Sequence, residues 1–313
     1  MRRINAYVLA ADPTWLEASV LAYYPFINEL IVCYDRNGHG WTGASIPLEE
    51  CLARLRSLDR DQKIRWLPGH FSEPRADPMD NDTLQRNVAL ALASESADWV
   101  IQLDTDEWVP EPASFLEGIA RADRLGVSAL EWPMRILFRQ LPGGEMLEVC
   151  SADKEDHYEY IAPVAVRAHS RLRLARKTDG RFLRATVVED KRSLQLKRGL
   201  LEGEVREAFL GPEQVIVHNS WARDAAQVRR KLGSWSHSSL RIWMYYGMRW
   251  LPAPLLWRGM RNLHPLSGTL WPALRKCECR LPSAELGADY RVADVLKVAG
   301  IDAQSEVESR FSK

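Results

Sequence analysis

Short apolar runs alternate with helix-like segments through the first 130 residues, and this alternation constrains the fold more than any other feature. The apolar runs have the length of buried strands and occupy residues 6–11, 29–34, 64–68 and 99–103. The segments between them have helical spacing or composition, over residues 12–23, 47–58 and 83–96. Strands that alternate with helices imply crossover connections, and therefore a mainly parallel sheet with helices on both faces.

Two helices carry a capping signal at their start. Asp12 followed by Pro13 predicts an N-cap and a proline in the first helical turn. Ser114 with Glu117 three residues later predicts a capping box for a helix that ends near residue 125. We expect the helices to begin at these residues, because side-chain oxygens there accept bonds from otherwise unpaired backbone amides.

Composition excludes several classes of protein. The chain has 313 residues, of which 46% are hydrophobic, so it can build a full core and general disorder is excluded. Its 42 basic and 42 acidic side chains cancel, and no nucleic-acid partner is predicted. The charge is uneven, however: residues 1–120 hold 19 acidic and 10 basic side chains, whereas residues 223–276 hold 10 basic and one acidic. The two regions are expected to contact different partners.

The cysteines and the hydropathy of the sequence indicate the cellular compartment in which the protein is expected. Five cysteines are an odd number without zinc-ribbon spacing, which predicts reduced thiols and a cytoplasmic protein. The sequence lacks an uninterrupted apolar run of about 20 residues, the length that a membrane-spanning helix needs. A peripheral membrane contact remains open on this evidence.

A carboxylate cluster, Asp104-Thr105-Asp106-Glu107, follows the apolar run 99–103. In an extended chain, side chains two residues apart project to the same side, so Asp104 and Asp106 are expected to share one ligand. Two such charges raise each other's pKa unless a cation lies between them, and carboxylate oxygens suit Mg²⁺ or Mn²⁺. The ion would bridge diphosphate oxygens and stabilise a leaving nucleoside diphosphate. The alternative is a solvated turn.

Four pieces of the sequence follow one another in the order typical of a known enzyme family. They are Val8-Leu9-Ala10-Ala11-Asp12, Ile31-Val32-Cys33-Tyr34-Asp35-Arg36-Asn37-Gly38, Gln85-Arg86-Asn87 and Leu103-Asp104-Thr105-Asp106. Over residues 4–110 the chain thereby resembles the family 2 glycosyltransferases of the GT-A fold. The resemblance implies an α/β, Rossmann-like GT-A fold, with a mainly parallel sheet flanked by helices.

The resemblance also implies a division of the chain and an activity. Residues 1–222 would form the transferase domain, with a nucleotide-binding half over 1–130 and an acceptor half over 131–222, followed by a helical Trp/Arg-rich extension over 223–313. The enzyme would move a sugar from a UDP- or GDP-linked donor to a hydroxyl group of a saccharide or lipid-linked acceptor. It would require Mn²⁺ or Mg²⁺.

The resemblance further implies roles for individual residues. The nucleotide contacts would come from Ala10, Asp35, Arg86 and Asp104. The metal ligands would be Asp104, Asp106 and His218, the last of these at the end of a short apolar run at residues 215–217. For Asp35 the alternative is a turn cap, for Arg86 it is positioning Asp104 or a solvated helix charge, and for His218 it is a structural histidine.

A general base is also required, since the acceptor hydroxyl must lose its proton. The resemblance implies an acidic pair on the acceptor side, and Glu189-Asp190 is the nearest match. Asp153, Glu155 and Asp156 compete with that pair for the role. Each of these side chains is alternatively a surface charge.

Tryptophan and arginine interleave in residues 235–276. This combination suits an anionic membrane surface, a lipid-linked acceptor or stacking on sugar rings. Four prolines, at residues 252, 254, 265 and 272, prevent a single long helix. The alternative is a packed lid of short helices whose tryptophans complete the core.

Two other functions compete with glycosyl transfer. The first is a haloacid-dehalogenase-like phosphohydrolase with Asp104 as nucleophile and Asp106 as acid. That family carries its Asp-x-Asp on the first strand, whereas this motif follows the fourth predicted strand. The second is a non-catalytic scaffold that keeps the fold and binds a partner through its aromatic tail.

Overall fold

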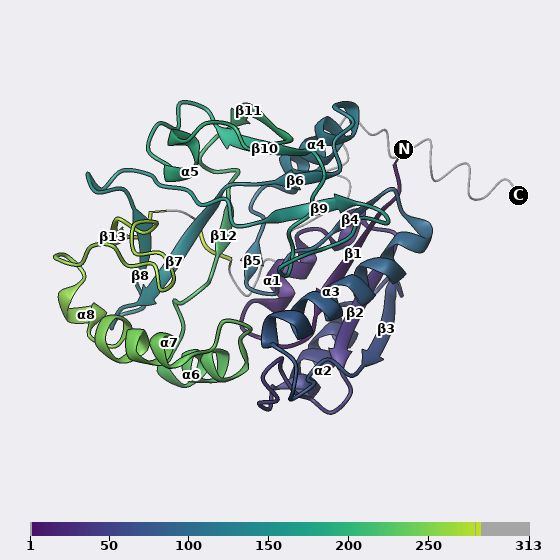
Figure 1. Cartoon of the computed structure of the whole chain (residues 1–313), viewed down its shortest axis with the longest axis horizontal. Coiled ribbons are helices and arrows are strands. Elements are labelled where there is room, and N and C mark those ends of the chain that lie inside the picture. Colours follow the sequence, from purple (N-terminus) through teal and green to yellow (C-terminus); the bar gives the residue numbers. More distant parts are fainter. Residues whose placement is uncertain (1, 279, 283–313) are drawn as a thin grey trace, which may run out of the picture.

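The computed structural model describes residues 2–278 and 280–282. Its largest element is an eight-stranded sheet (Figure 1). In spatial order, its strands are β11 (Glu204–Leu210), β10 (Phe182–Val187), β6 (Ala129–Glu131), β9 (Pro163–Arg167), β4 (Trp99–Ile101), β1 (Ile4–Leu9), β2 (Leu30–Asp35) and β3 (Ile64–Gly69). All neighbouring strands are parallel except β9, which is antiparallel to both β4 and β6. The mainly parallel sheet that the sequence predicts is therefore confirmed.

Helices cover both faces of this sheet, because successive strand residues point to opposite sides. Ala6 and Val8 of β1 face helices α1 (Leu16–Leu21) and α2 (Leu48–Leu58) in one apolar cluster. Tyr7 and Leu9 face helix α3 (Pro78–Ala93) in another. The short helices η1 (Tyr24–Phe26) and η2 (Ser94–Ser96) complete this half. Burial on both faces explains why these strands appear in the sequence as continuous apolar runs.

A second sheet of five strands lies beside the first. Its order is β13 (Ala273–Lys276), β8 (Met146–Cys150), β7 (Met134–Gln140), β12 (Ile216–His218) and β5 (Glu107–Trp108). Helix α4 (Pro112–Arg124) packs against β6 and β10 of the first sheet (Figure 1), and the short helix α5 (Leu194–Lys197) lies between β10 and β11 in the sequence. One buried apolar cluster spans both sheets and includes Trp99, Trp108, Trp132 and Trp250. Strand β5, directly after the carboxylate cluster, thus joins the cluster to the second sheet.

Both predicted helix starts are wrong. Helix α1 begins at Leu16, and the Asp12 side chain instead accepts a bond from the Thr14 backbone amide at 3.0 Å. Helix α4 begins at Pro112, so Ser114 lies inside it, where its hydroxyl accepts a bond from Gln214. A local turn therefore takes the Asp12 oxygen, and a tertiary partner takes the Ser114 hydroxyl, both of which the sequence assigned to capping.

The C-terminal segment wraps the second sheet. It contains α6 (Ala225–Ser234), α7 (Leu240–Tyr245), a π-helix η3 (Tyr246–Trp250) and α8 (Ala253–Leu256), which line one edge of the molecule (Figure 1). Strand β13 then pairs with β8, so the segment is not purely helical. The rest of the predicted extension, at residue 279 and residues 283–313, lies outside the described residues. Within the described ranges, none of the helices combines the length and hydrophobicity of a bilayer-spanning segment.

Candidate functional site

A cavity of about 590 Å³ lies where strands of the two sheets end. Ala10 after β1, Asp35 at the end of β2 and Asp104 after β4 all line it. Parallel strands place their carboxyl ends at one edge of a sheet, so residues far apart in sequence meet there. The second sheet contributes His218, and the C-terminal segment contributes residues between Ser234 and Trp271.

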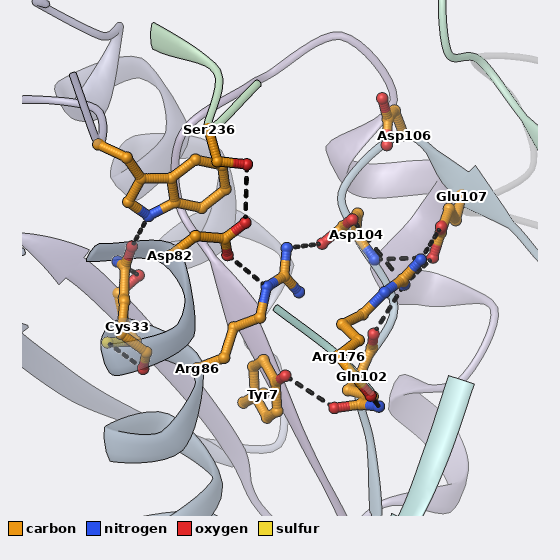
Figure 2. A network of polar contacts seen from close by, with 12 residues as sticks. Tyr7, Cys33, Asp82, Arg86, Gln102, Asp104, Asp106, Glu107, Arg176 and Ser236 are labelled. Atoms are coloured by element: carbon orange, nitrogen blue, oxygen red, sulfur yellow. Dashed lines mark hydrogen bonds and ion pairs between the residues drawn. The ribbon is translucent and has the colours of Figure 1, made fainter. Parts of the chain in front are cut away.

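The Asp104–Glu107 turn occupies one wall of the cavity. Strand β4 ends at Ile101, and the Glu107 backbone amide donates to the Asp104 carbonyl at 3.0 Å. The expected extended conformation at Asp104 and Asp106 is therefore wrong, and the two carboxylates do not face one shared partner. Asp104 points toward Arg86 (Figure 2), whereas Asp106 contacts a different set of side chains.

Arg86 fixes the position of Asp104. Its side chain is 4% exposed and donates to Asp82 at 2.6 Å and to Asp104 at 2.9 Å (Figure 2). Asp82 and Arg86 stand four residues apart on α3, so they share one helix face. The structure thus shows the positioning role among those that the sequence left open for Arg86. Contact between Arg86 and a bound nucleotide remains a prediction.

Asp106 is surrounded by basic side chains. Its carboxylate accepts bonds from Arg223 and from Lys231, the latter at 3.0 Å. His218 lies opposite, with Nε2 3.6 Å from Oδ1 of Asp106. This proximity follows from the pairing of β12 with β5, which sets His218 beside Glu107 although the two are 111 positions apart in the chain. The structure therefore brings together two of the three predicted metal ligands.

The carboxyl groups of Asp104 and Asp106 have pKa values below the usual range. Burial raises the pKa of Asp104, but the guanidinium groups of Arg86 and Arg176 lower it by more in total. Burial likewise raises the pKa of Asp106, and Lys231 and His218 together outweigh it. Asp106 does raise the pKa of Asp104, as expected for neighbouring like charges, but this increase is smaller than the decrease that the cations cause. Side-chain cations of the protein itself supply the compensating charge.

The side chains present fit a divalent ion only with help from a ligand. Within the described ranges, no group of three or more His, Cys, Asp or Glu side chains is arranged to hold a metal ion. Asp106 Oδ1 and His218 Nε2 are close enough to be two neighbouring ligands of one ion. Mg²⁺ is commonly held by one or two protein groups and completed by substrate phosphates and water. Binding of Mn²⁺ or Mg²⁺ by Asp106 and His218 remains a prediction.

An ion pair between Arg176 and Glu107 supports the turn. The sequence predicted a role for neither residue. Both guanidinium nitrogens of Arg176 donate to the Glu107 carboxylate, each at 2.6 Å (Figure 2). Glu107 in turn accepts from the Asp104 backbone amide at 3.0 Å. Glu107 is completely buried, so this pair replaces the water that each charge loses. The orientation of Asp104 depends on this support.

Asp35 serves as a cap for two loops. One oxygen accepts from the backbone amides of Asn37 at 2.9 Å and His39 at 3.4 Å. The other accepts from Phe71 at 2.8 Å and from the Ser72 hydroxyl at 3.2 Å. The turn-cap alternative is thus seen directly. The predicted nucleotide contacts of Asp35 and Ala10 remain predictions.

The structure places Glu189 and Asp190, the acidic pair predicted to supply the general base, outside the cavity. Glu189 and Asp190 follow β10, and neither belongs to the residues that line the described cavity. Asp190 accepts from the backbone amides of Arg192 and Ser193, each at 3.0 Å. Two of the competing acids form ion pairs. Asp153 pairs with Arg192 at 3.2 Å, and Asp156 pairs with Arg135 and Arg275. Glu155 is exposed outside the cavity.

Glu159 is the acidic side chain that sequence reasoning overlooked. It lines the cavity, is 3% exposed, and its Oε1 has no hydrogen-bond partner in the described part of the chain. Two backbone bonds to Met134 at the start of β7 hold it in place, at 2.9 and 3.0 Å. Burial raises the pKa of Glu159 to about 8. The Trp271 side chain lowers the pKa of Glu159 by less than burial raises it. A buried carboxyl group with one unpaired oxygen is unusual and marks a site where a proton can be taken up.

Comparisons with known proteins place the chain only coarsely. No protein-family model matches it, and no curated protein matches it. Among solved structures, it is similar to 4-diphosphocytidyl-2C-methyl-D-erythritol synthase of Anaerococcus prevotii DSM 20548, with TM-score 0.31 and 14% identity over 53% of this chain and 72% of that one. It is also similar to mannose-6-phosphate isomerase of Helicobacter pylori, with TM-score 0.28 and 12% identity over 46% of this chain and 57% of that one. Scores this low support no argument about function.

Architecture and site together define a class. The chain is a mixed α/β protein with a large, mainly parallel sheet flanked by helices. Its cavity lies at the carboxyl ends of the parallel strands, where proteins with open α/β sheets bind their ligands.

Proposed function

We propose that this protein is a glycosyltransferase of the family 2 type with a GT-A fold, acting on a nucleotide-diphosphate sugar. One observation carries the proposal: a single strand-end cavity is lined by the Asp104–Glu107 turn, by basic side chains and by the buried acid Glu159. These are the groups that binding a diphosphate and removing an acceptor proton require. The sequence motifs over residues 4–110 support the same class.

Basic side chains in the cavity would stabilise the negative charge of the leaving diphosphate. Arg230 and Lys231, on neighbouring positions of α6, both line the cavity. Negative charge grows on the nucleoside diphosphate as its bond to the sugar breaks, and fixed cations in a partly buried site stabilise it. Lys231 lies 3.0 Å from Asp106, so the protein itself orients its ammonium group. The geometry thus favours loss of a diphosphate leaving group.

A divalent cation would complete this arrangement. Asp106 and His218 would hold the ion. Asp104, two residues before Asp106 in the same turn, is held in place by Arg86. Bound Mn²⁺ or Mg²⁺ supplies positive charge that neutralises the diphosphate oxygens. Imidazole among the ligands favours Mn²⁺ over Mg²⁺.

Glu159 is the residue that we assign to proton removal. In an inverting transfer, the acceptor oxygen forms a bond to the anomeric carbon while the bond from that carbon to the diphosphate oxygen breaks. The acceptor proton passes to Oε1 of Glu159, which needs its carboxylate form. A pKa of about 8 makes the group a stronger base than an ordinary glutamate at the same pH.

Donor turnover tests the proposal. Incubation with UDP- and GDP-sugars in Mn²⁺ should release the nucleoside diphosphate, slowly to water and faster with a saccharide or lipid-linked acceptor. Release of inorganic phosphate from phosphate esters, without release of nucleoside diphosphate from any sugar donor, would instead establish the phosphohydrolase alternative. Absence of both reactions would favour the non-catalytic scaffold.

A further inference from the structure

An exposed apolar stripe runs along the C-terminal helices. Of the large apolar side chains that are exposed in the described part of the chain, half lie between residues 240 and 256. Their spacing follows the helical repeat: Leu240, Met244, Met248, Leu251 and Leu255. Exposed fractions reach 68% at Met248 and 85% at Leu255. Water therefore contacts an apolar ridge that extends over α7, η3 and α8.

The opposite side of the same helices is packed into the protein. Ile242, Tyr246, Trp250 and Ala253 are buried at the same helical spacing. The indole nitrogen of Trp250 donates to the carbonyls of Phe138 and Trp221, each at 3.1 Å. Packing of the core thus explains one apolar stripe and leaves the other without a partner in the described chain. Exposed apolar area of this extent marks an interaction site.

Basic side chains flank the exposed stripe. No aspartate or glutamate occurs from residue 225 to residue 277, whereas Arg241, Arg249, Arg258 and Arg261 are all exposed. Arg241 donates to the Leu266 carbonyl at 3.3 Å, and the guanidinium carbon of Arg258 lies 4.6 Å from the Trp257 ring centroid. Their positive charge is therefore available to a partner. Exposed leucine, methionine and tryptophan beside arginine form the composition that inserts into an anionic bilayer surface.

We propose that residues 240–261, here called the 240–261 surface, bind the face of an anionic phospholipid bilayer. The helices would lie in the plane of the interface, with the ridge among the acyl chains and the arginines at the phosphates. Residues 264–271 follow this surface directly and supply His264, Leu270 and Trp271 to the cavity wall. Docking would bring the cavity close to lipid headgroups. Together with the proposed transferase activity, this predicts an acceptor carried by a membrane lipid.

Vesicle sedimentation tests the surface independently of any catalysis. The full chain is mixed with phosphatidylcholine vesicles, with or without phosphatidylglycerol, and the bound fraction is measured against lipid concentration. We expect binding to vesicles that contain phosphatidylglycerol, and weaker binding as salt is raised. The double variant Met248→Glu/Leu255→Glu should bind at least about tenfold more weakly, because two apolar contacts are replaced by charges that repel the lipid.

A matched control separates this surface from a general effect of added charge. Leu84→Glu/Leu200→Glu changes two leucines that are 52% and 64% exposed on other elements, and it should bind vesicles as the unchanged protein does. Equal loss in both double variants, or absence of vesicle binding by the unchanged protein, would overturn the proposal. Sedimentation velocity covers a further case: a dimer that Met248→Glu/Leu255→Glu converts to monomer would assign the ridge to a second copy of the chain. Because none of these measurements involves a sugar donor, the surface and the proposed activity can fail separately.

Discussion

Two regions of the molecule, the Asp104–Glu107 turn and the 240–261 surface, handle charge in opposite ways. In the Asp104–Glu107 turn, every carboxylate is paired with a buried or partly buried cation, and Arg86, Arg176 and Arg223 are at most 6% exposed. On the 240–261 surface, arginines are exposed in a stretch of sequence without any carboxylate. The first arrangement fixes geometry, because each charge depends on its partner. The second leaves charge free for an external ligand.

This contrast predicts that single substitutions in the turn affect the fold as well as binding. Asp106→Asn removes the counter-charge that Arg223 and Lys231 share in a buried site; Lys231 then has no carboxylate partner among the described residues, and Arg223 keeps only Asp12. We expect loss of about 3–5 kcal/mol of unfolding free energy, together with loss of Mn²⁺-dependent donor binding. Urea denaturation measures the first effect and calorimetry the second. Asp153→Asn, at an exposed ion pair, is the control and should change unfolding free energy by less than about 1 kcal/mol. Equal stability of both variants would contradict the contrast.

Glu159→Gln tests the opposite case, since this buried acid pairs with no cation in the described part of the chain. Transfer should fall by about 10²–10⁴-fold, the usual contribution of a general base. Stability should rise. The pKa of Glu159 is raised from 4.5 to about 8, so between these values the unfolded chain releases a proton that the native chain keeps, and unfolding free energy falls as pH rises. The variant should therefore be more stable than the unchanged protein by about 3 kcal/mol at pH 7.

Two measurements examine this prediction. The transfer rate of the unchanged enzyme should increase with pH up to about 8, as Glu159 ionises. In denaturant melts between pH 5 and 8, the stability advantage of Glu159→Gln should grow with pH. Glu155→Gln, at an exposed position outside the cavity, should alter neither quantity. A Glu159→Gln variant with undiminished transfer would remove the residue from the mechanism.

Lys231→Met has a smaller expected effect, since Arg223 still pairs with Asp106. Loss of one charge-assisted bond to the diphosphate should weaken nucleoside diphosphate binding by about tenfold. Calorimetric titration gives the value directly. Lys276→Met, whose ammonium group pairs with Glu145 on the outer surface, is the matched control. If both variants bind nucleotide equally well, Lys231 does not contact the leaving group.

The smallest effect is expected on the 240–261 surface, where no single charge is fixed. Replacing Arg249 by glutamine should weaken binding to phosphatidylglycerol vesicles by about fivefold, since one basic residue contributes about 1 kcal/mol near an anionic bilayer. Stability should not change, because Arg249 is exposed. Vesicle sedimentation and a thermal melt record the two quantities. A large loss of stability would show that Arg249 is fixed by buried partners, as the charges of the turn are.

How far the sequence predicted this arrangement follows from the range of each interaction. The sequence correctly predicted that Asp35 and Asp104 line one cavity, because each follows an apolar strand and such strands are recognisable from local hydrophobicity. It failed for Arg176, which reaches Glu107 from 69 residues away through a loop with no periodic pattern. It failed also for Glu159, because burial alone distinguishes this residue from its neighbours Asp153, Glu155 and Asp156. Side-chain burial depends on how the second sheet packs, which a single sequence does not reveal.

The central claim is that the strand-end cavity binds a nucleoside diphosphate. Isothermal titration with UDP and with GDP, each with and without Mn²⁺, tests it most directly. We predict saturable binding of one of the two nucleotides at a single site, strengthened by Mn²⁺ and lost in Asp106→Asn. Absence of binding by both nucleotides to the folded protein, with or without the ion, would contradict the account.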